Sequence, residues 1–461
     1  MTKHLRQFLA ALGGSFGLVP GLMVLAGISG GVALVSVDRS GLVPTWLIDS
    51  AWLYNGGGTG ARTLLGAVAG STIGVAGTVF SITIAALSLA AGQMGPRLLR
   101  NFTRDRGNQI TLGAFLGTFS YALMVLRSVR TQSEGEFVPH LSLSIGILLA
   151  FVCVGTLVYF VAHMAGRINV DTVIELVSGE VRAAIARVGQ PDRNVVTPAL
   201  PGLVWHGAGV VTDPRHGYVE RLDADQLADW ADQNQTTLRL LVRAGDYVFP
   251  GAPIALAKPQ VDGVAVAVGR ATTLQAARAS SDDLEYSVRQ LVEVAVRALS
   301  PGINDPHTAM NALDRLGAAL CELAPMTLPT GTYIRRDRCV LVVPVVDYDG
   351  LVDAMFHLIR QNAAGSAAVL IRVIEVLTSV ASCERDPLRA KALQRHADLI
   401  LGDAERDVRT PADLRDIRGR HARFEAVRAH GAYGFIDEEV DRGGYANAMA
   451  GSSNIASAGK R

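Results

Sequence analysis

The chain has 461 residues, of which 49% are hydrophobic and 18% are charged, and its formal net charge is +1. Such a balanced chain lacks the basic excess typical of nucleic-acid binding, so no nucleic acid is expected as a partner. The charge is unevenly distributed, because residues 1–163 hold ten Lys or Arg and five Asp or Glu, a net +5 that leaves −4 for the rest.

Four long apolar segments predict four membrane-spanning helices. These segments are 18–37, 63–91, 110–126 and 141–163. Lys3 and Arg6 precede the first segment, and residues 97–106 between the second and third segments hold four arginines. Lysine occurs at only four positions and arginine supplies the other basic residues, a bias typical of GC-rich bacterial genomes. Because basic loops favour the cytoplasmic side, we expect a multi-pass protein of the bacterial inner (plasma) membrane with both termini in the cytoplasm.

The second segment carries small and hydroxyl-bearing residues at helical spacing. Gly66, Gly70 and Gly74 recur every fourth residue, which would let another helix approach closely. The hydroxyl-bearing residues that are candidates for lining a pore are Ser71, Thr78, Ser81 and Ser88. Two interpretations stay open: the hydroxyls bond to carbonyls one turn earlier, or they line a hydrated path between copies of the helix.

A basic stretch follows the second segment. Pro96 can begin a short helix there, since proline lacks only a donor that the first turn leaves unpaired. At helical spacing its arginines cluster on one side: Arg97, Arg100 and Arg104. They would bind anionic lipid headgroups, or form a cationic inner collar that favours anions.

The remainder of the chain predicts a cytoplasmic α+β domain. A helix is expected within 167–200, connecting the membrane domain of residues 1–166 to the rest. Over 201–270, the string from Gly245 to Ile254 resembles the turn-rich signature of small barrel-sandwich (lipoyl-like) β domains. Lys258 does not lie on the exposed hairpin that a lipoyl carrier needs, so this β unit is expected to be structural.

Residues 271–435 predict an α-rich subdomain with a short strand. The apolar run 339–346 is typical of a buried strand, and it precedes four helical segments near 348–363, 367–384, 386–405 and 411–428. Residues 436–461 are rich in Gly, Ser, Ala and Asn, a composition that predicts a disordered tail.

Segment 282–309 predicts two consecutive helices joined by a short turn. One helix ends at a Pro-Gly turn, and the next begins at an Asp-Pro pair that supplies the N-cap and the first helical residue. The junction also offers three candidates for a ligand-binding or switching role: Asn304, Asp305 and His307. The alternative is that these residues only shape the junction.

Several strings resemble one known family. They are Phe80-Ser81, Gly95 through Phe102, Asp105 through Gln109, Ala298 through Pro306, and Thr308-Ala309. The chain is similar along almost its whole length, to about residue 435, to the predicted bacterial membrane proteins of the domain of unknown function 2254 family. The resemblance implies a membrane protein, and the family name assigns no activity.

Two functions are compatible with these features. The first is an oligomeric ion channel or passive transport protein, in which the second span lines the path and the cytoplasmic domain regulates it. The alternative is a membrane-anchored sensor or scaffold whose cytoplasmic domain binds a ligand or partner protein. The expected partners are membrane lipids, further copies of the chain and a small ion.

An enzyme is not expected. The sequence shows no nucleophile–base pair, phosphate-binding loop or metal-ligand spacing. We therefore predict no catalytic residue, no metal and no cofactor.

Overall fold

The computed structural model describes residues 17–40, 54, 56–94, 105–130, 137–167, 170–189, 205–278 and 284–436. The chain divides into two compact units, Met1–Val173 and Ile174–Arg461. The division falls within helix α8 (Val170–Val188). Two expectations concern residues outside the described ranges: the cluster of arginines at 97, 100 and 104, and the tail beyond residue 436.

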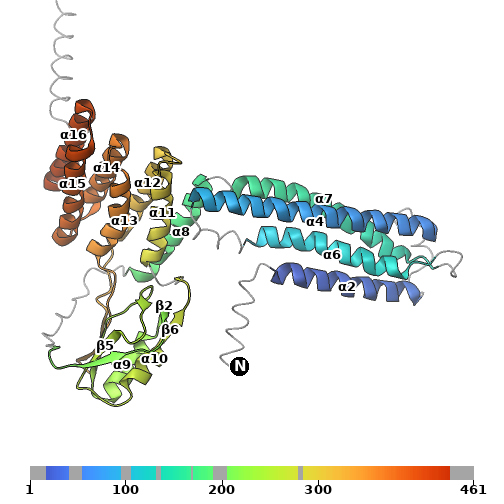
Figure 1. Cartoon of the computed structure of the whole chain (residues 1–461), viewed down its shortest axis with the longest axis horizontal. Coiled ribbons are helices and arrows are strands. Elements are labelled where there is room, and N and C mark those ends of the chain that lie inside the picture. Colours follow the sequence, from blue (N-terminus) through green and yellow to red (C-terminus); the bar gives the residue numbers. More distant parts are fainter. Residues whose placement is uncertain are drawn as a thin grey trace, which may run out of the picture. The chain divides into compact units, whose positions relative to one another are not determined.

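Within its described residues, the first unit contains four helices that are long and apolar enough to cross a membrane. They are α2 (Leu18–Arg39), α4 (Gly58–Met94), α6 (Arg106–Ser128) and α7 (His140–Arg167), and they run beside one another (Figure 1). The prediction of four apolar helices is confirmed. Each begins or ends a few residues beyond the predicted bounds, because helical hydrogen bonding continues into the polar flanks.

Helix α6 packs against all three other helices of this unit. Glycines permit its close approach to α2. A Cβ on Gly27 would meet the backbone of Gly117, and a Cβ on Gly117 would lie 2.9 Å from the carbonyl oxygen of Met23. Without side chains at these two positions the backbones touch, which is how helices associate where no hydrophobic effect drives them together.

Helix α4 buries one narrow face against its neighbours α6 and α7. The buried residues follow steps of three and four: Ala61, Leu65, Ala69, Thr72, Ala76, Val79, Thr83 and Ala86. This spacing gives a seam along one side of the helix, as in coiled coils. The two buried threonine hydroxyls donate to carbonyls one turn earlier, Thr72 to Val68 at 2.7 Å and Thr83 to Val79 at 2.8 Å.

Asp38, near the end of α2, caps the start of α7. Its carboxylate accepts hydrogen bonds from the backbone N–H of Leu141 at 3.2 Å and of Ser142 at 3.0 Å. The Ser142 hydroxyl donates to the same carboxylate at 2.5 Å. Because the first N–H groups of a helix have no partner within it, this contact both satisfies them and fastens α7 to α2.

The described part of the second unit forms two sheets. Its strands are β1 (Gly209–Thr212), β2 (Gly217–Leu222), β3 (Thr237–Leu240), β4 (Tyr247–Val248), β5 (Pro253–Lys258), β6 (Thr272–Gln275), β7 (Thr332–Arg335) and β8 (Arg338–Val342). The larger sheet has the order β1-β5-β3-β8-β7, and only the pair β3–β8 is parallel. The smaller sheet, β4-β2-β6, is antiparallel.

The lipoyl-like barrel-sandwich expected over 201–270 is not shown. Two helices, α9 (Ala224–Gln233) and α10 (Val264–Ala271), interrupt the strands, and β7 and β8 from a later part of the chain complete the larger sheet. The signature string does form a turn, since Asp246 accepts the backbone N–H of Arg243 at 3.0 Å. Such a turn suits several β folds, so it does not fix the topology.

Further helices lie among the described residues of the second unit (Figure 1). They are α11 (Leu284–Ala298), α12 (Pro306–Leu323), α13 (Tyr348–Asn362), α14 (Ala367–Cys383), α15 (Pro387–Asp407), α16 (Pro411–His430) and the 3-10 turn η3 (Gly431–Phe435). The four helices predicted after the strand are thus confirmed as α13 to α16. Asp347 and Asp386 cap α13 and α15 by accepting the backbone N–H of Gly350 and Leu388.

Candidate functional site

A second face of α4 is exposed in this chain and consists of small residues only. Its members again follow steps of three and four: Thr63, Ala67, Gly70, Gly74, Gly77, Ser81, Ala85, Ser88 and Gly92. At about 100° per residue, this small-residue face lies opposite the buried seam. No atom lies within 4 Å of a Cβ built on Gly70, Gly74, Gly77 or Gly92.

Large apolar residues border the small-residue face on both sides. The exposed ones on α4 are Leu64, Ile73, Phe80, Ile82, Ile84 and Leu89. Such side chains suit contact with lipid tails, whereas the small-residue face between them carries little side-chain bulk. A second helix could pack against that face with the two backbones close together.

The four predicted pore-lining residues are exposed in this chain. Three of them donate to a carbonyl of their own helix: Ser71 to Val68 at 3.1 Å, Thr78 to Gly74 at 3.2 Å and Ser81 to Gly77 at 2.9 Å. Ser88 makes no side-chain hydrogen bond within the part of the chain that the structure describes. Ser81 and Ser88 belong to the small-residue face, and Ser71 and Thr78 lie along one edge of it.

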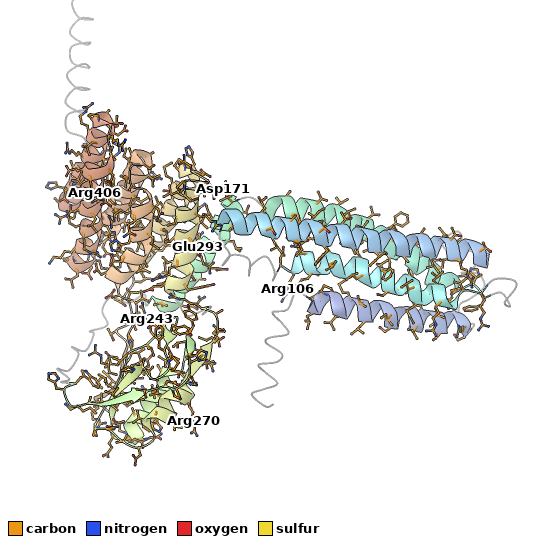
Figure 2. All side chains as sticks on the ribbon, viewed as in Figure 1. Arg106, Asp171, Arg243, Arg270, Glu293 and Arg406 are labelled. Carbon is orange, nitrogen blue, oxygen red and sulfur yellow. The ribbon has the colours of Figure 1, made fainter. Side chains whose placement is uncertain are left out.

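A polar cluster lies where α6 begins, at the end of the bundle that Arg106 marks in Figure 2. Asp105 is the N-cap of α6, and its Oδ1 accepts the backbone N–H of Gly107 at 3.0 Å. Its Oδ2 lies 2.6 Å from Nε2 of His163 on α7. The ring of Tyr159 stacks on that imidazole, with centroids 5.3 Å apart.

Gly107 is required by this geometry. A Cβ at that position would lie 2.7 Å from Nε2 of His163 and 3.0 Å from the hydroxyl of Tyr159. The next polar residues, Asn108 and Thr111, are buried, and neither Oδ1 of Asn108 nor Oγ1 of Thr111 has a partner within the described ranges. Buried polar groups at a membrane helix are costly and commonly functional.

This polar cluster was not predicted as a site from the sequence. Asp105 through Gln109 were noted there only as a string that resembles a known family. The available signal was a run of polar residues at the start of an otherwise apolar helix, together with a histidine at the end of the fourth span. Only the fold shows that Asp105 and His163, 58 positions apart, are in contact.

The helix junction is built from hydrogen bonds. Asn304 has a left-handed backbone, with φ of 50°, and its N–H donates to the carbonyl of Ser300 at 2.9 Å. Asp305 caps α12 by accepting the N–H of Thr308 at 3.1 Å and its hydroxyl at 2.6 Å. These hydrogen bonds lower the pKa of Asp305 below its usual value. The side chain of His307 is exposed, and its ligand-binding role stays a prediction.

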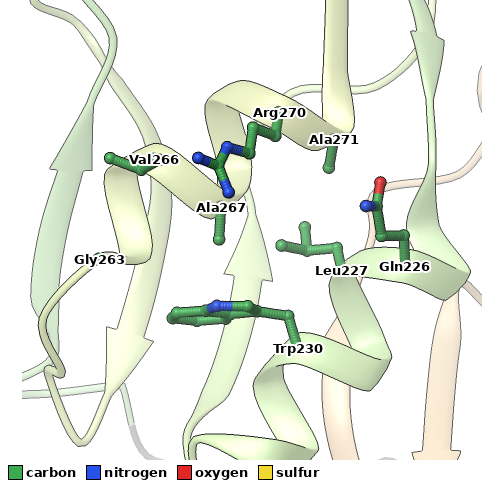
Figure 3. Close-up of a pocket in the computed structure, with 8 residues that line it drawn as sticks. All are labelled: Gln226, Leu227, Trp230, Gly263, Val266, Ala267, Arg270 and Ala271. Atoms are coloured by element: carbon green, nitrogen blue, oxygen red, sulfur yellow. The ribbon is translucent and has the colours of Figure 1, made fainter.

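A cavity of about 320 Å³ lies between α9 and α10 (Figure 3). Its lining is mostly apolar, with the indole of Trp230 from α9 facing Ala267 and Arg270 of α10, and it also includes the side chain of Gln226. The guanidinium of Arg270 has no ion pair or hydrogen bond within the described part of the chain. An apolar cavity with one unpaired cation fits a small organic anion with a flat apolar body.

Comparisons with known proteins match most of the chain. The family model described as "Predicted membrane protein (DUF2254)" matches residues 13–379. Uncharacterized proteins of Mycobacterium tuberculosis and Mycobacterium bovis are each 31% identical to this chain over 450 residues, which cover 93% of this chain and 83% of the relative. No solved structure matches the chain.

Proposed function

Because the chain belongs to the domain of unknown function 2254 family of predicted membrane proteins, we propose that it is an oligomeric channel or passive transport protein of the bacterial inner membrane. In this proposal, α4 helices of several copies meet along the small-residue face. Ser81 and Ser88, with Ser71 and Thr78 at the edge, line a path for a small ion. The second unit regulates the path from the cytoplasm, where both termini lie.

The small-residue face is the observation that carries this proposal. One face of α4 is already occupied by α6 and α7, and the opposite face repeats Gly, Ala, Ser or Thr from Thr63 to Gly92. A purely lipid-facing surface gains nothing from so many small residues. An interface between helices does, because small residues allow van der Waals contact between backbones and hydrogen bonds between hydroxyls.

The hydroxyls also fit a weakly polar path. Hydroxyls that bond to their own helix expose lone pairs without adding charge, so ions would be held weakly enough to leave again. Ser88 lacks an intramolecular partner among the described residues, and an unpaired hydroxyl against lipid costs free energy. Water or a second copy of the chain would supply the missing partner.

Flux measurements on liposomes containing the full chain test the proposal. Ser81→Leu adds bulk to the small-residue face and is expected to abolish flux. Ile82→Leu keeps the volume of a bordering side chain and is expected to preserve flux. The absence of flux or single-channel currents under varied ions, voltage, pH and membrane tension would contradict the proposal, as would undiminished flux in Ser81→Leu.

A second function, a membrane-anchored sensor, is favoured by the cavity beside Trp230. In that case the second unit binds a small anion and the four helices serve as an anchor. Naphthalene-2-carboxylate is a suitable probe, because it is flat, apolar and anionic. It should quench the fluorescence of Trp230, and Arg270→Gln should weaken its binding at least tenfold, whereas Arg239→Gln on β3 should not. Equal binding by both variants would count against this function.

A further inference from the structure

Three side chains able to bind a metal ion meet where α13 packs on α15. Asp353 and His357 lie one turn apart on α13, and His396 comes from α15. Nε2 of His396 is 2.8 Å from Oδ1 of Asp353, and Nε2 of His357 is 3.1 Å from the same oxygen. The two imidazole rings are in contact, with centroids 4.8 Å apart.

We propose that Asp353, His357 and His396 form a binding site for one divalent transition-metal ion of the Zn²⁺ class. One carboxylate oxygen and two imidazole nitrogens are a common ligand set for this ion, and a water molecule can complete a tetrahedral shell. The site lies outside the membrane helices, and it does not depend on the channel proposal.

The spacing of the ligand atoms fits such an ion closely. Ligands about 2.0–2.1 Å from a tetrahedral ion lie roughly 3.3 Å from one another. The observed separations of 2.8 and 3.1 Å therefore need to open by only a few tenths of an ångström. One ligand atom from each of the three residues already lies within 4.8 Å of the others.

One side of the site is exposed to solvent. The side chain of His396 is fully buried, whereas those of His357 and Asp353 are about one-third exposed. An ion and its water ligand can enter from that side. Nδ1 of both histidines is buried and without a hydrogen-bond partner among the described residues. Each ring donates from Nε2 to the carboxylate of Asp353, and its proton must move to Nδ1 when Nε2 binds the ion.

Arg395 lies beside the site and donates to two carboxylates. Its NH2 group is 2.5 Å from Oδ1 of Asp353 and 3.0 Å from Oδ1 of Asp349. When a cation occupies the site, Arg395 can keep its bond to Asp349 and turn away from the oxygen that binds the ion. Groups just outside the ligand shell commonly tune affinity in this way.

A second cluster of similar composition provides a contrast. Asp398, His421 and Glu425 bring ligand atoms together between α15 and α16. There the side-chain amide of Gln394 donates to Asp398 at 3.0 Å and also to Glu425. The amide thus fills the space between the two carboxylates, so we assign the metal to the first cluster and use the second as a control.

Metal titration of the full chain in detergent, after removal of bound metal with a chelator, tests the site. Added Co²⁺ should give the visible absorption of a tetrahedral complex, Zn²⁺ should displace it, and elemental analysis should find one ion per chain. His357→Gln should weaken binding by about 100-fold or more. Because the side chain of His357 is one-third exposed, that variant is chosen to preserve the fold, and its circular dichroism is the check.

His421→Gln is the matched control and should bind the ion with unchanged affinity. His396→Gln should lose binding as His357→Gln does, provided that its circular dichroism matches the parent chain. The site assignment fails if the parent chain binds less than one-tenth of an ion, if both His357→Gln and His396→Gln retain full affinity, or if only His421→Gln loses it.

Discussion

Nε2 of His163 lies 2.6 Å from Oδ2 of Asp105, which joins the last turns of α7 to the N-cap of α6. The Asp105 side chain is 5% exposed and that of His163 is 19% exposed. Because the other oxygen of the same carboxylate caps α6 through Gly107, one side chain both starts a helix and fastens its neighbour.

Gly107→Ala is expected to destabilise this contact. The added methyl group would lie 2.7 Å from Nε2 of His163, so either the imidazole or the helix must move. Overpacking of this kind costs about 1–3 kcal/mol. Thermal unfolding of the full chain in detergent should therefore begin at a lower temperature than in the parent protein.

Gly155→Ala on α7 is the control for that experiment. No atom lies within 4 Å of a Cβ at Gly155, so the same substitution meets open space. It should leave the stability unchanged or raise it by about 0.5–1 kcal/mol, since alanine favours a helix more than glycine does. Equal unfolding temperatures for the two variants would contradict the role assigned to Gly107.

Cysteine crosslinking will show whether α4 helices of different copies meet. In a chain whose four native cysteines are replaced, Ser81→Cys should form disulfide-linked dimers in the membrane, because position 81 lies on the small-residue face. Ile82→Cys should not, since the next residue points about 100° away. Efficient crosslinking at position 82 alone would place the contact on another face.

Asp305→Ala removes the cap of α12 and should lower stability by about 1 kcal/mol at neutral pH. Hydrogen bonds from the side chain and N–H of Thr308 hold the pKa of Asp305 below its unfolded value. The contribution of Asp305 to the free energy of unfolding is therefore complete above about pH 4, and it is lost as the pH falls through the lower, native pKa.

The unfolding temperatures of the parent chain and Asp305→Ala should thus converge below pH 4. Circular dichroism melts at pH 7 and at successively lower pH would measure the difference. A gap that stays constant down to pH 2 would show that the ionised carboxylate is not what stabilises the cap.

Cys321 and Cys383 should differ sharply in reactivity. Burial, together with the neighbouring thiol of Cys383, raises the pKa of Cys321 to about 12. At pH 8 only about one Cys321 in 10⁴ is then a thiolate, the form that reacts with alkylating agents. Cys383 is exposed. Mass spectrometry after brief iodoacetamide treatment should find Cys383 modified well before Cys321.

The rate of alkylation at Cys321 should rise about tenfold per pH unit between pH 8 and 10, because each unit multiplies the thiolate fraction by ten. Cys383→Ser provides the control, since it removes the fast site while Cys321 should stay slow. Modification of Cys321 as fast as Cys383 at pH 8 would contradict its raised pKa.

The local order of apolar and polar residues was sufficient to predict the helices. The charge-free stretch from Thr63 to Ala91 predicted α4. Within residues 348–428 the apolar side chains recur at helical spacing, which predicted α13 to α16, because burial of one face of a helix requires that spacing. The barrel-sandwich prediction went beyond such local information. It rested on a turn-rich string from Gly245 to Ile254, which does not reveal that β8, about 100 residues after β3 in the chain, pairs with β3.

The metal cluster illustrates the same limit. Asp353 and His357 have the spacing of one helical turn, but any amphipathic helix can contain such a pair. Their third partner, His396, lies on another helix. No spacing in the sequence marks it as a ligand, so the sequence analysis predicted no metal.

The sequence by itself determined that this protein has four apolar helices and that α4 repeats small residues, because both properties depend on the order of neighbouring side chains. Only the tertiary structure decided which face of α4 is already packed, that Asp105 meets His163, and that β7 and β8 complete the larger sheet. These are contacts between residues far apart in the chain, and they are set by how whole elements pack together.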